Sequence, residues 1–526
     1  MTAPRLDRTT AARLPADARP RVDPGELRPR VVHFGLGAFH RAHQAVYTET
    51  AAAATGEPWG IVAVAPRSEG PVTALREQDL LYSVTDREPG AQRTRVVGAF
   101  ADALRMGPDA AHLTELLAGE EVSVVTMTIT EKAYCRRPDT GALDLDAPGI
   151  AADLAATAVD GAPLGTVIGR LAACLVARHR ASAAPISVVC CDNMTGNGAA
   201  LAAAVTGFVA ASAWPDRAAV LDWMAGSVTF PATVVDRIVP AVTRQERDAA
   251  RAALGLRDEM AVFGEPYRQW VLEDAFAAPR PRWELDGALF VPDVAPYQLM
   301  KLRLLNGAHS ALAYLGLAAG CRTVADVLAT GWGERLVRRF GSEVATTLPG
   351  AGLDHQSYLG DLVERFSNPA MHHLLRQIGS DGSLKIPERW LGPLRELRSA
   401  GSTAPMLELA LAGWINATRP ATGGGQWFGT TDPASARLAD CWATPGGPRA
   451  VVAALLRAVG AADLADDEQL LTAVADRLPA VEAGRIDLEN PVPDGTTPVR
   501  CCGCKGARDD AQRVDHRTGG RQQNDR

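Results

Sequence analysis

The feature of the sequence that most constrains the fold is a series of short apolar runs that alternate with helix-compatible segments. The runs are RVVHF (30–34), GIVAVA (60–65), VSVVTMTIT (122–130) and PISVVC (185–190). They are rich in β-branched residues and almost continuously apolar, which is typical of parallel strands buried on both faces. Helix-compatible segments cover about 39–54 and 165–180. We therefore predict an α/β domain over residues 29–290, with helices on both faces of a parallel sheet.

The rest of the chain has a different pattern. After about residue 290, strand-like runs become scarce, and Leu/Ala-rich helical segments continue to about residue 487. We predict a second, mainly α-helical domain over 291–490, with the active site in the cleft between the two domains. The first 28 residues, rich in Arg and Pro, are expected to form an arm. The tail 491–526 has few apolar residues, so we expect it to be disordered.

Composition excludes several classes of function. The 54 Lys and Arg against 61 Asp and Glu lack the basic excess of a nucleic-acid-binding protein. Nine cysteines, an odd number, do not indicate a disulfide framework, and Cys501, Cys502 and Cys504 lack a clear fourth ligand for zinc. We find neither a signal peptide nor an apolar stretch suited to a membrane span. We expect a cytoplasmic protein with no nucleic-acid or membrane partner and no metal.

The segment GLGAFH (35–40) follows the first predicted strand and opens a helix. In a dinucleotide-binding loop, a glycine at Gly35 permits the tight turn, and one at Gly37 lets the backbone approach a pyrophosphate. His40 stands where a third glycine is usual, so a plain strand–helix turn is the alternative. The residues directly after Ala65, Pro66-Arg67-Ser68, include no acidic side chain at the place where one usually holds the adenosine ribose. Arg67, two residues later, could meet a ribose phosphate, lie on the adenine, or simply be exposed.

Polar residues also cluster on a predicted helix, PYQLMKLRLLNGAHSALAYLG (296–316). At 100° per residue, Lys301, Asn306 and His309 lie at roughly 0°, 140° and 80°, on one face. There Lys301 could act as general base, Asn306 could polarise a carbonyl, and His309 could orient a hydroxyl. Taken singly, they could be an exposed Lys, a capping Asn and a core His. Tyr297 and Lys301 also form a Y-x-x-x-K pair, but short-chain dehydrogenases place theirs much nearer the nucleotide loop.

Two further segments follow strand-like runs. In CCDNMTGNG (190–198), Asn193 and Asn197 are placed to contact cofactor or substrate, because ligands bind at the carboxyl ends of parallel strands. Alternatively, they form the turn and cap the next helix. Asp236 ends another run and could orient a catalytic partner or pair with Arg237.

Together these segments resemble the mannitol dehydrogenase family, polyol-specific long-chain dehydrogenases that include fructuronate reductase. The matching stretches run from about residue 33 to residue 390: HFGLGAFHRAHQAVYTE, TITEKAYC, CCDNMTGNG, FPATVVDRIVPA, EPYRQWVLED, KLRLLNGAHSALAYLG and RFSNPAMHHLLRQIGSDGSLKIPERW. The resemblance implies a Rossmann-like doubly wound domain, a helical C-terminal domain, and metal-independent, NAD(P)-linked oxidation of a secondary alcohol.

By the same resemblance, Lys301 is the general base, Asn197 and Asn306 hold the developing oxyanion, and His309 positions the substrate. The other residues that it assigns are Gly35, Gly37, Phe39, Arg67, Glu131, Lys132 and Asn193 for the cofactor, and Asp236 for the substrate. Many members carry Glu where Gln298 stands, and Gln cannot titrate. NAD is expected, with NADP possible through Arg67, and a monomer is favoured.

The segment GSLKIPER (382–389) bears on the substrate. Pro387 makes a helix unfavourable, so we predict an extended segment in which Lys385 and Arg389 point the same way. Two such cations suit a carboxylate; alternatively, Arg389 pairs with Glu388 or Asp381. The K-I-P-x-R pattern resembles the fructuronate reductase-like members more than the mannitol-specific ones. We therefore favour D-mannonate and D-fructuronate over mannitol and fructose, with a catalytically inactive nucleotide-sensing protein as a further alternative.

Overall fold

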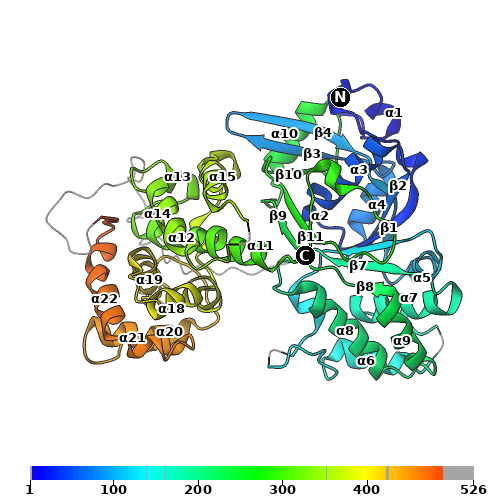
Figure 1. Cartoon of the computed structure of the whole chain (residues 1–526). Helices are drawn as coiled ribbons and strands as arrows, with labels where there is room; N and C mark the ends of the chain where they lie inside the picture. Colours follow the sequence, from blue (N-terminus) through cyan, green and yellow to red (C-terminus); the bar gives the residue numbers. More distant parts are fainter. Residues whose placement is uncertain (1–2, 138, 160, 351, 422–425, 490–526) are drawn as a thin grey trace, which may run out of the picture. The chain divides into compact units, whose positions relative to one another are not determined.

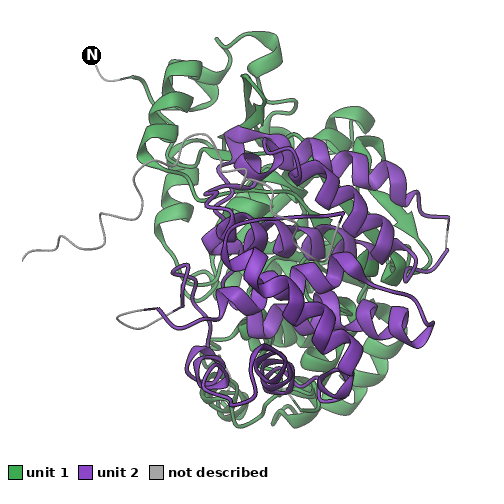
Figure 2. Cartoon of the chain, turned by 90° about the vertical axis from the view of Figure 1, so that its left-hand side faces the viewer, with its two compact units in different colours: residues 1–299 green, residues 300–526 purple. Residues whose placement is uncertain are grey.

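The computed structural model describes residues 3–137, 139–159, 161–350, 352–421 and 426–489. The predicted tail and its three cysteines therefore lie outside the described residues. The chain divides into two compact units, Met1–Leu299 and Met300–Arg526, coloured separately in Figure 2. We describe each unit by itself.

A six-stranded, wholly parallel sheet forms the centre of the first unit, in the order β5-β2-β1-β6-β7-β8 (Figure 1). This is the order of two βαβαβ halves that meet where the strand order reverses, between β1 and β6. The predicted doubly wound parallel sheet is confirmed. The strands are β1 (Arg28–Phe34), β2 (Trp59–Ala65), β5 (Phe100–Arg105), β6 (Val124–Met127), β7 (Ile186–Cys190) and β8 (Val228–Thr229).

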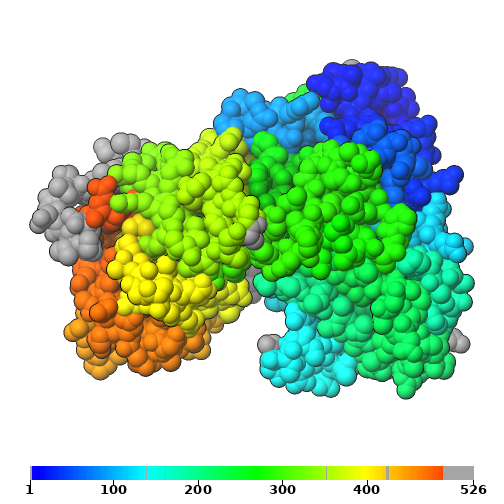
Figure 3. All heavy atoms as spheres, in the orientation of Figure 1, coloured from blue at the N-terminus to red at the C-terminus, as the bar shows by residue number. Residues whose placement is uncertain are grey.

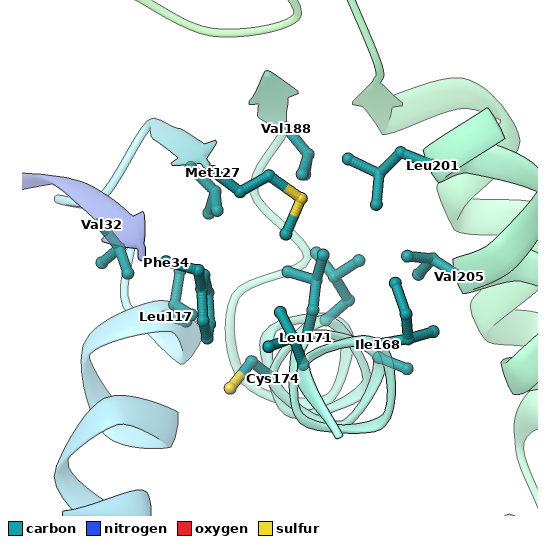
Figure 4. Close-up of a cluster of buried hydrophobic side chains, with 14 of the residues drawn as sticks. Val32, Phe34, Leu117, Met127, Ile168, Leu171, Cys174, Val188, Leu201 and Val205 are labelled. Carbon is teal, nitrogen blue, oxygen red and sulfur yellow. The ribbon is translucent and has the colours of Figure 1, made fainter. Parts of the chain in front are cut away.

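Helices cover both faces of this sheet because alternate side chains of each strand point to opposite faces. Val32 and Phe34 pack with α5, α7 and α8 in one buried cluster, shown in Figure 4, whereas Val31 packs in the cluster on the α3 side. The helix expected over 39–54 is divided at His43, whose ψ is −93°. The helices are α1 (Arg8–Ala11), α2 (Ala38–Ala42), α3 (Gln44–Thr55), α4 (Gly70–Glu77), α5 (Ala110–Ala118), α6 (Pro148–Ala156), α7 (Val167–Ala181), α8 (Asn197–Ala211), α9 (Arg217–Ser227), α10 (Arg244–Leu254) and α11 (Ala295–Met300).

Two small sheets, absent from the sequence predictions, complete this unit. One has the order β10-β3-β4, from Val262–Gly264, Tyr82–Glu88 and Ala91–Val97; the other has the order β12-β11-β9, from Leu289–Val291, Gln269–Glu273 and Thr233–Asp236. The N-terminal segment, expected to be an arm, packs against this unit. Its Leu6, Ala11 and Leu14 are buried in a cluster that includes Leu81 and Val96.

The second unit is helical, as predicted. Its central helix α12 is buried almost all round and contacts α14, α16 and α19. An evenly apolar helix needs such surroundings. The elements are η5 (Lys301–Asn306), α12 (Gly307–Ala318), α13 (Val324–Leu328), α14 (Gly333–Ala345), α15 (His355–Ser367), α16 (Leu375–Ile378), α17 (Gly382–Ile386), η7 (Pro387–Leu391), α18 (Gly392–Ser399), α19 (Pro405–Ala417), α20 (Ser435–Cys441), α21 (Pro448–Ala458) and α22 (Glu468–Glu482), of which η5 and η7 are π-helical.

The prediction that 382–389 is extended is wrong. The segment is helical, running through α17 into the π-helical turn η7, and Pro387 is the first residue of that turn. A proline ring clashes with the carbonyl four residues earlier in an α-helix, and the wider π turn shifts that carbonyl out of register. Lys385 and Arg389, four residues apart, still lie on neighbouring parts of one face, now because of helical periodicity.

Candidate functional site

The turn after β1 has two glycines with different surroundings. Gly35 has a φ of +113°, and a Cβ there would lie 2.1 Å from the carbonyl oxygen of Thr128, so a side chain is excluded. Gly37 has an ordinary φ of −89°, and the nearest atom to a Cβ there is 3.9 Å away. Gly35 is thus required by the turn itself, and the space beside Gly37 is open, as a loop that admits a phosphate needs.

A buried histidine ties this turn to the neighbouring strand. His33 Nε2 lies 3.0 Å from the carbonyl oxygen of Gly35, which can only accept, so Nε2 carries the proton. Nδ1 then accepts from the Thr126 hydroxyl at 2.7 Å. Burial lowers the pKa of His33 to about 3, against the hydrogen bond to Gly35, so the ring is neutral at physiological pH.

Asp192, at the end of β7, connects two loops at the carboxyl edge of the sheet. Its Oδ1 accepts from the Ile129 N–H at 2.9 Å, and its Oδ2 accepts from the Tyr134 hydroxyl. Cys190 Sγ lies 2.7 Å from the Tyr134 hydroxyl and 3.3 Å from Asp192. Burial raises the pKa of Asp192 to about 6 despite these hydrogen bonds. The network fixes the segment that carries Glu131 and Lys132 beside the segment that carries Asn193.

Asn197 is fully buried and its amide is engaged by the main chain. Its Nδ2 donates to the carbonyl oxygens of Asp192 at 2.9 Å and Thr233 at 3.0 Å, and its Oδ1 accepts from the Thr233 N–H at 3.0 Å. Both N–H groups are therefore used in holding β7, α8 and β9 together. The contact of Asn197 with the developing oxyanion, which the family resemblance implies, stays a prediction.

The remaining predicted residues of this unit differ in exposure. Phe39 is half-buried and stacks on His43 with ring centroids 4.9 Å apart. Asp236 is buried at the end of β9, and the Arg237 guanidinium binds the carbonyls of Glu265 and Ala42 and the carboxylate of Asp86, so the suggested pairing of Arg237 with Asp236 is not what the structure shows. The exposed members of the set are Arg67, Glu131, Lys132 and Asn193.

Gln298 is linked to this edge of the sheet by weak contacts. Its Nε2 lies 3.4 Å from the Thr233 carbonyl oxygen, and its Oε1 lies 3.5 Å from the Gly196 nitrogen. Both distances are beyond the usual range for hydrogen bonds, so the amide is only loosely held.

In the second unit, the predicted catalytic residues lie on a helix whose first part is π-helical. The Gly307 N–H reaches back five residues to the Leu302 carbonyl oxygen, which identifies the wider turn. The prediction of a helix is correct, but the assumed 100° spacing does not hold over 301–306. Lys301, Asn306 and His309 are all half-buried, whereas Arg303, Leu304 and Leu305 are buried, so the three share the accessible side. Such π turns occur frequently at functional sites.

His309 lies among aromatic and cationic side chains. Its ring stacks on Phe366 at 4.9 Å and lies 5.6 Å from the ring of His373. Burial, followed by the charges of His373, Arg389, Arg365 and Lys385, lowers its pKa well below the usual value. Within the described part of the chain, its buried Nε2 has no hydrogen-bond partner. A neutral imidazole with a buried, unpaired nitrogen next to several cations is suited to receive a polar ligand group.

Lys385 and Arg389 are both oriented by main-chain and hydroxyl oxygens. Lys385 Nζ donates to the Ser380 carbonyl oxygen at 2.6 Å and lies 3.9 Å from an Asp381 carboxylate oxygen. Arg389 Nη1 donates to the Ser310 hydroxyl at 2.8 Å and lies 3.4 Å from the Asn306 carbonyl oxygen. Burial and the charge of Arg389 lower the pKa of Lys385, and burial lowers that of Arg389.

Several residues of these surroundings were not identified from the sequence. The quoted segments contain four such residues: Tyr134, Cys190, Arg365 and His373. Their contacts could not be predicted, because the spacing of residues along the sequence does not show which distant side chains they meet. Across the described ranges, no group of three or more His, Cys, Asp or Glu side chains could hold a metal ion. None of the helices in the described part of the chain is long and apolar enough to cross a membrane.

Comparison with known proteins assigns both units to one family. The family model described as the mannitol dehydrogenase Rossmann domain matches residues 29–285, and that of the mannitol dehydrogenase C-terminal domain matches residues 293–482. D-mannonate oxidoreductase of Escherichia coli (strain K12) is 38% identical over 422 residues, which are 79% of this chain and 85% of that protein.

Two solved structures are similar over 91% of this chain. Substrate-free D-sorbitol dehydrogenase matches with a TM-score of 0.82 and 29% identity over 99% of its own chain. The mannitol 2-dehydrogenase of Pseudomonas fluorescens, in a ternary complex with NAD and D-mannitol, matches with a TM-score of 0.74 and 31% identity over 96% of its chain.

Proposed function

The chain belongs to the mannitol dehydrogenase family, and we propose that it oxidises D-mannonate to D-fructuronate with NAD as the hydride acceptor. The observation that carries the choice of a sugar acid is the group of cations around His309, namely Arg365, Lys385 and Arg389. The similarity to D-mannonate oxidoreductase supports it.

The turn after β1 fits a dinucleotide. The open space beside Gly37 suits the pyrophosphate. Gly35, where a side chain would clash with the Thr128 carbonyl oxygen, allows the tight turn at the carboxyl edge of the sheet. The other residues that would hold NAD are Phe39, Glu131, Lys132 and Asn193. When bound, NAD supplies a hydride acceptor. The NAD complex of the mannitol 2-dehydrogenase favours NAD here, and the exposed Arg67 leaves NADP as the alternative. A kcat/KM about tenfold higher with NADP, about 1.4 kcal/mol, would overturn this preference.

The chain's own residues supply the proton chemistry. Lys301 takes the hydroxyl proton as general base, and the Asn306 amide donates to the oxygen on which negative charge develops. The neutral His309 binds a substrate hydroxyl through its unpaired Nε2. Asn197 acts as a positioning residue, because its amide holds the main chain of Asp192 and Thr233.

Lys301→Ala tests the assignment of the base. We expect turnover to fall by about two to four orders of magnitude, the range for a lost general base. The Kd for NADH, measured by fluorescence titration, should stay at the wild-type value. Unchanged turnover in the variant would refute the role of Lys301. If the wild type itself showed no turnover, the alternative of a catalytically inactive nucleotide-sensing protein would be supported.

The cations explain a preference for a carboxylate. Burial lowers the pKa values of both Lys385 and Arg389, so a negative charge near them would stabilise their charged forms. A carboxylate supplies that charge, and the guanidinium of Arg389 can bind both oxygens of a carboxylate. Neither effect would be available from a neutral polyol.

Arg389→Ala tests this preference. We expect kcat/KM for fructuronate to fall by a factor that corresponds to about 2–4 kcal/mol, as for the loss of a charge-assisted contact, with little change in activity on fructose. Arg395→Ala is the matched control, because Arg395 lies on the following helix and pairs with Asp463 at 2.6 Å. If the wild type reduces fructose faster than fructuronate at equal concentration, the substrate is a neutral polyol, as the similarity to the mannitol and sorbitol enzymes would then suggest.

A further inference from the structure

A cavity in the first unit brings six arginines together. It has a volume of about 320 Å³, and its wall includes Arg19, Arg21, Arg93, Arg95, Arg237 and Arg268. In a chain with a net charge of −7, such a concentration of one cationic side chain is unusual. We propose that this cavity binds a small phosphoryl anion that carries two or more negative charges, at a site separate from the dinucleotide turn.

The β3–β4 hairpin supplies one wall. In the antiparallel register of the two strands, Asp86 lies opposite Arg93 and Val84 lies opposite Arg95. Because alternate residues of a strand share a face, these four side chains lie together on one side of the hairpin. Val46 and Thr50, one turn apart on α3, also line the cavity. The N-terminal segment, which contacts β4, also contributes lining residues, and Figure 3 shows the two segments side by side at the surface.

Three of the arginines are held by carboxylates. Arg95 Nη1 lies 2.6 Å from Glu49, Arg237 pairs with Asp86, and Arg268 binds both carboxylate oxygens of Asp286 at 2.6 and 3.3 Å. The side chains of Arg95 and Arg237 are at most 14% exposed. These pairs fix the positions of the guanidinium groups, so they form a rigid base for the cavity.

The other three arginines add charge that these pairs do not compensate. Among the residues that the structure describes, Arg19, Arg21 and Arg93 form no ion pair. Arg19 Nε donates to the Leu14 carbonyl oxygen at 2.6 Å, and Arg21 Nη1 donates to the Thr50 hydroxyl at 2.8 Å, so both side chains are nevertheless oriented. Asp17 is the remaining acidic residue in the wall. The cavity therefore has a net positive charge and N–H donors available.

The geometry favours a phosphoryl group. A volume of about 320 Å³ is near the lower end of the range of ligand pockets, so the ligand is small. Guanidinium groups present paired N–H donors that match phosphate oxygens, and arginine is favoured where such recognition is needed. No residue of the wall belongs to the set proposed to hold NAD, so this inference does not depend on the proposed function.

Pyrophosphate is the probe, titrated into the full-length protein with NAD at saturating concentration to occupy the dinucleotide turn. Isothermal calorimetry is run with the ionic strength kept constant with KCl. We expect saturable binding that the double variant Arg21→Ala/Arg93→Ala weakens at least about tenfold, a loss of about 1.4 kcal/mol, because charge-assisted contacts to the anion are removed. The matched control Arg335→Ala/Arg338→Ala removes the same charge from α14 and should leave the Kd unchanged.

Four results would overturn the proposal, three of them for the site and one for the kind of ligand. The first is the absence of saturable heat with the wild type. The second is equal weakening, or none, in the two double variants. The third is loss of NADH binding together with pyrophosphate binding in Arg21→Ala/Arg93→Ala, because the probe would then have reported on the dinucleotide turn. Citrate that binds as tightly as pyrophosphate would overturn the assignment to a phosphoryl ligand.

Discussion

The two glycines of the turn after β1 should respond in opposite ways to the same substitution. Gly35→Ala places a methyl group where the Thr128 carbonyl oxygen lies, at a backbone φ of +113°. Gly37→Ala places a methyl group in open space at an ordinary φ of −89°. The comparison therefore separates a glycine that the fold requires from one that a ligand requires.

The magnitudes follow from the local geometry. A non-glycine residue in a sparsely populated backbone region costs about 1–3 kcal/mol, and a Cβ 2.1 Å from a backbone oxygen forces a further shift. We expect Gly35→Ala to lower the free energy of unfolding by about 3–5 kcal/mol in total. Gly37→Ala should raise it by about 0.4–1 kcal/mol, because alanine restricts the unfolded chain.

Gly37→Ala, which should stabilise the fold, should weaken NADH binding. A methyl group at position 37 lies where the pyrophosphate of NAD approaches the backbone, so the Kd for NADH should rise at least about tenfold, or 1.4 kcal/mol. Urea denaturation followed by circular dichroism gives the stabilities, and NADH fluorescence titration gives the affinities. If the folded Gly37→Ala protein binds NADH like the wild type, the turn after β1 is not the pyrophosphate site.

Two buried side chains allow further predictions. The folded-state pKa of His33, about 3, lies below its unfolded value of 6.5, so the unfolded state binds more protons and stability falls as the pH drops between these values. From pH 7.5 to pH 5, His33→Gln should lose about 2 kcal/mol less than the wild type in urea denaturation, and an equal loss would show that His33 titrates normally. Asn197→Ala should lower the free energy of unfolding by about 2–4 kcal/mol, because main-chain groups of Asp192 and Thr233 are left buried and unpaired. A wild-type denaturation midpoint combined with lost turnover would indicate that Asn197 contacts the substrate directly rather than holding the main chain.

The parallel sheet was predictable because its strands carry their own signal. Runs such as GIVAVA are apolar on both faces, and each of the four predicted runs overlaps a strand of the observed sheet. The β3–β4 hairpin was not predicted. Its strands carry Arg and Thr at alternate positions, and only pairing with the neighbouring strand shows that these residues belong to a sheet.

The sequence allowed candidate residues of the site to be named, but not the contacts between residues on different helices. The grouping of Lys301, Asn306 and His309 could be found because residues close in sequence on a helix are close in space. The cations around His309 come from three separate helical segments, so periodicity cannot bring them together. The segment around Pro387 was mispredicted because the rule against proline in helices assumes α-helical geometry, and the wider turn η7 relaxes it.

The two π-helical turns make the effect of a single-residue deletion depend on its place. A π turn contains one residue more per hydrogen-bonded ring than an α turn, so deleting one residue within 301–306 would allow a regular α-helix to form. The extra residue of the wider turn adds almost no rotation, so the helix before and after such a deletion would keep nearly its original orientation. Deleting a residue of the regular helix between Asn306 and His309 would instead rotate Lys301 and Asn306 by about 100° relative to His309. Lys301 would then leave the side of the helix that carries His309, although the deletion removes no catalytic group. The π turn at 387–391 likewise contains a residue that the helix can lose without a change of orientation on either side.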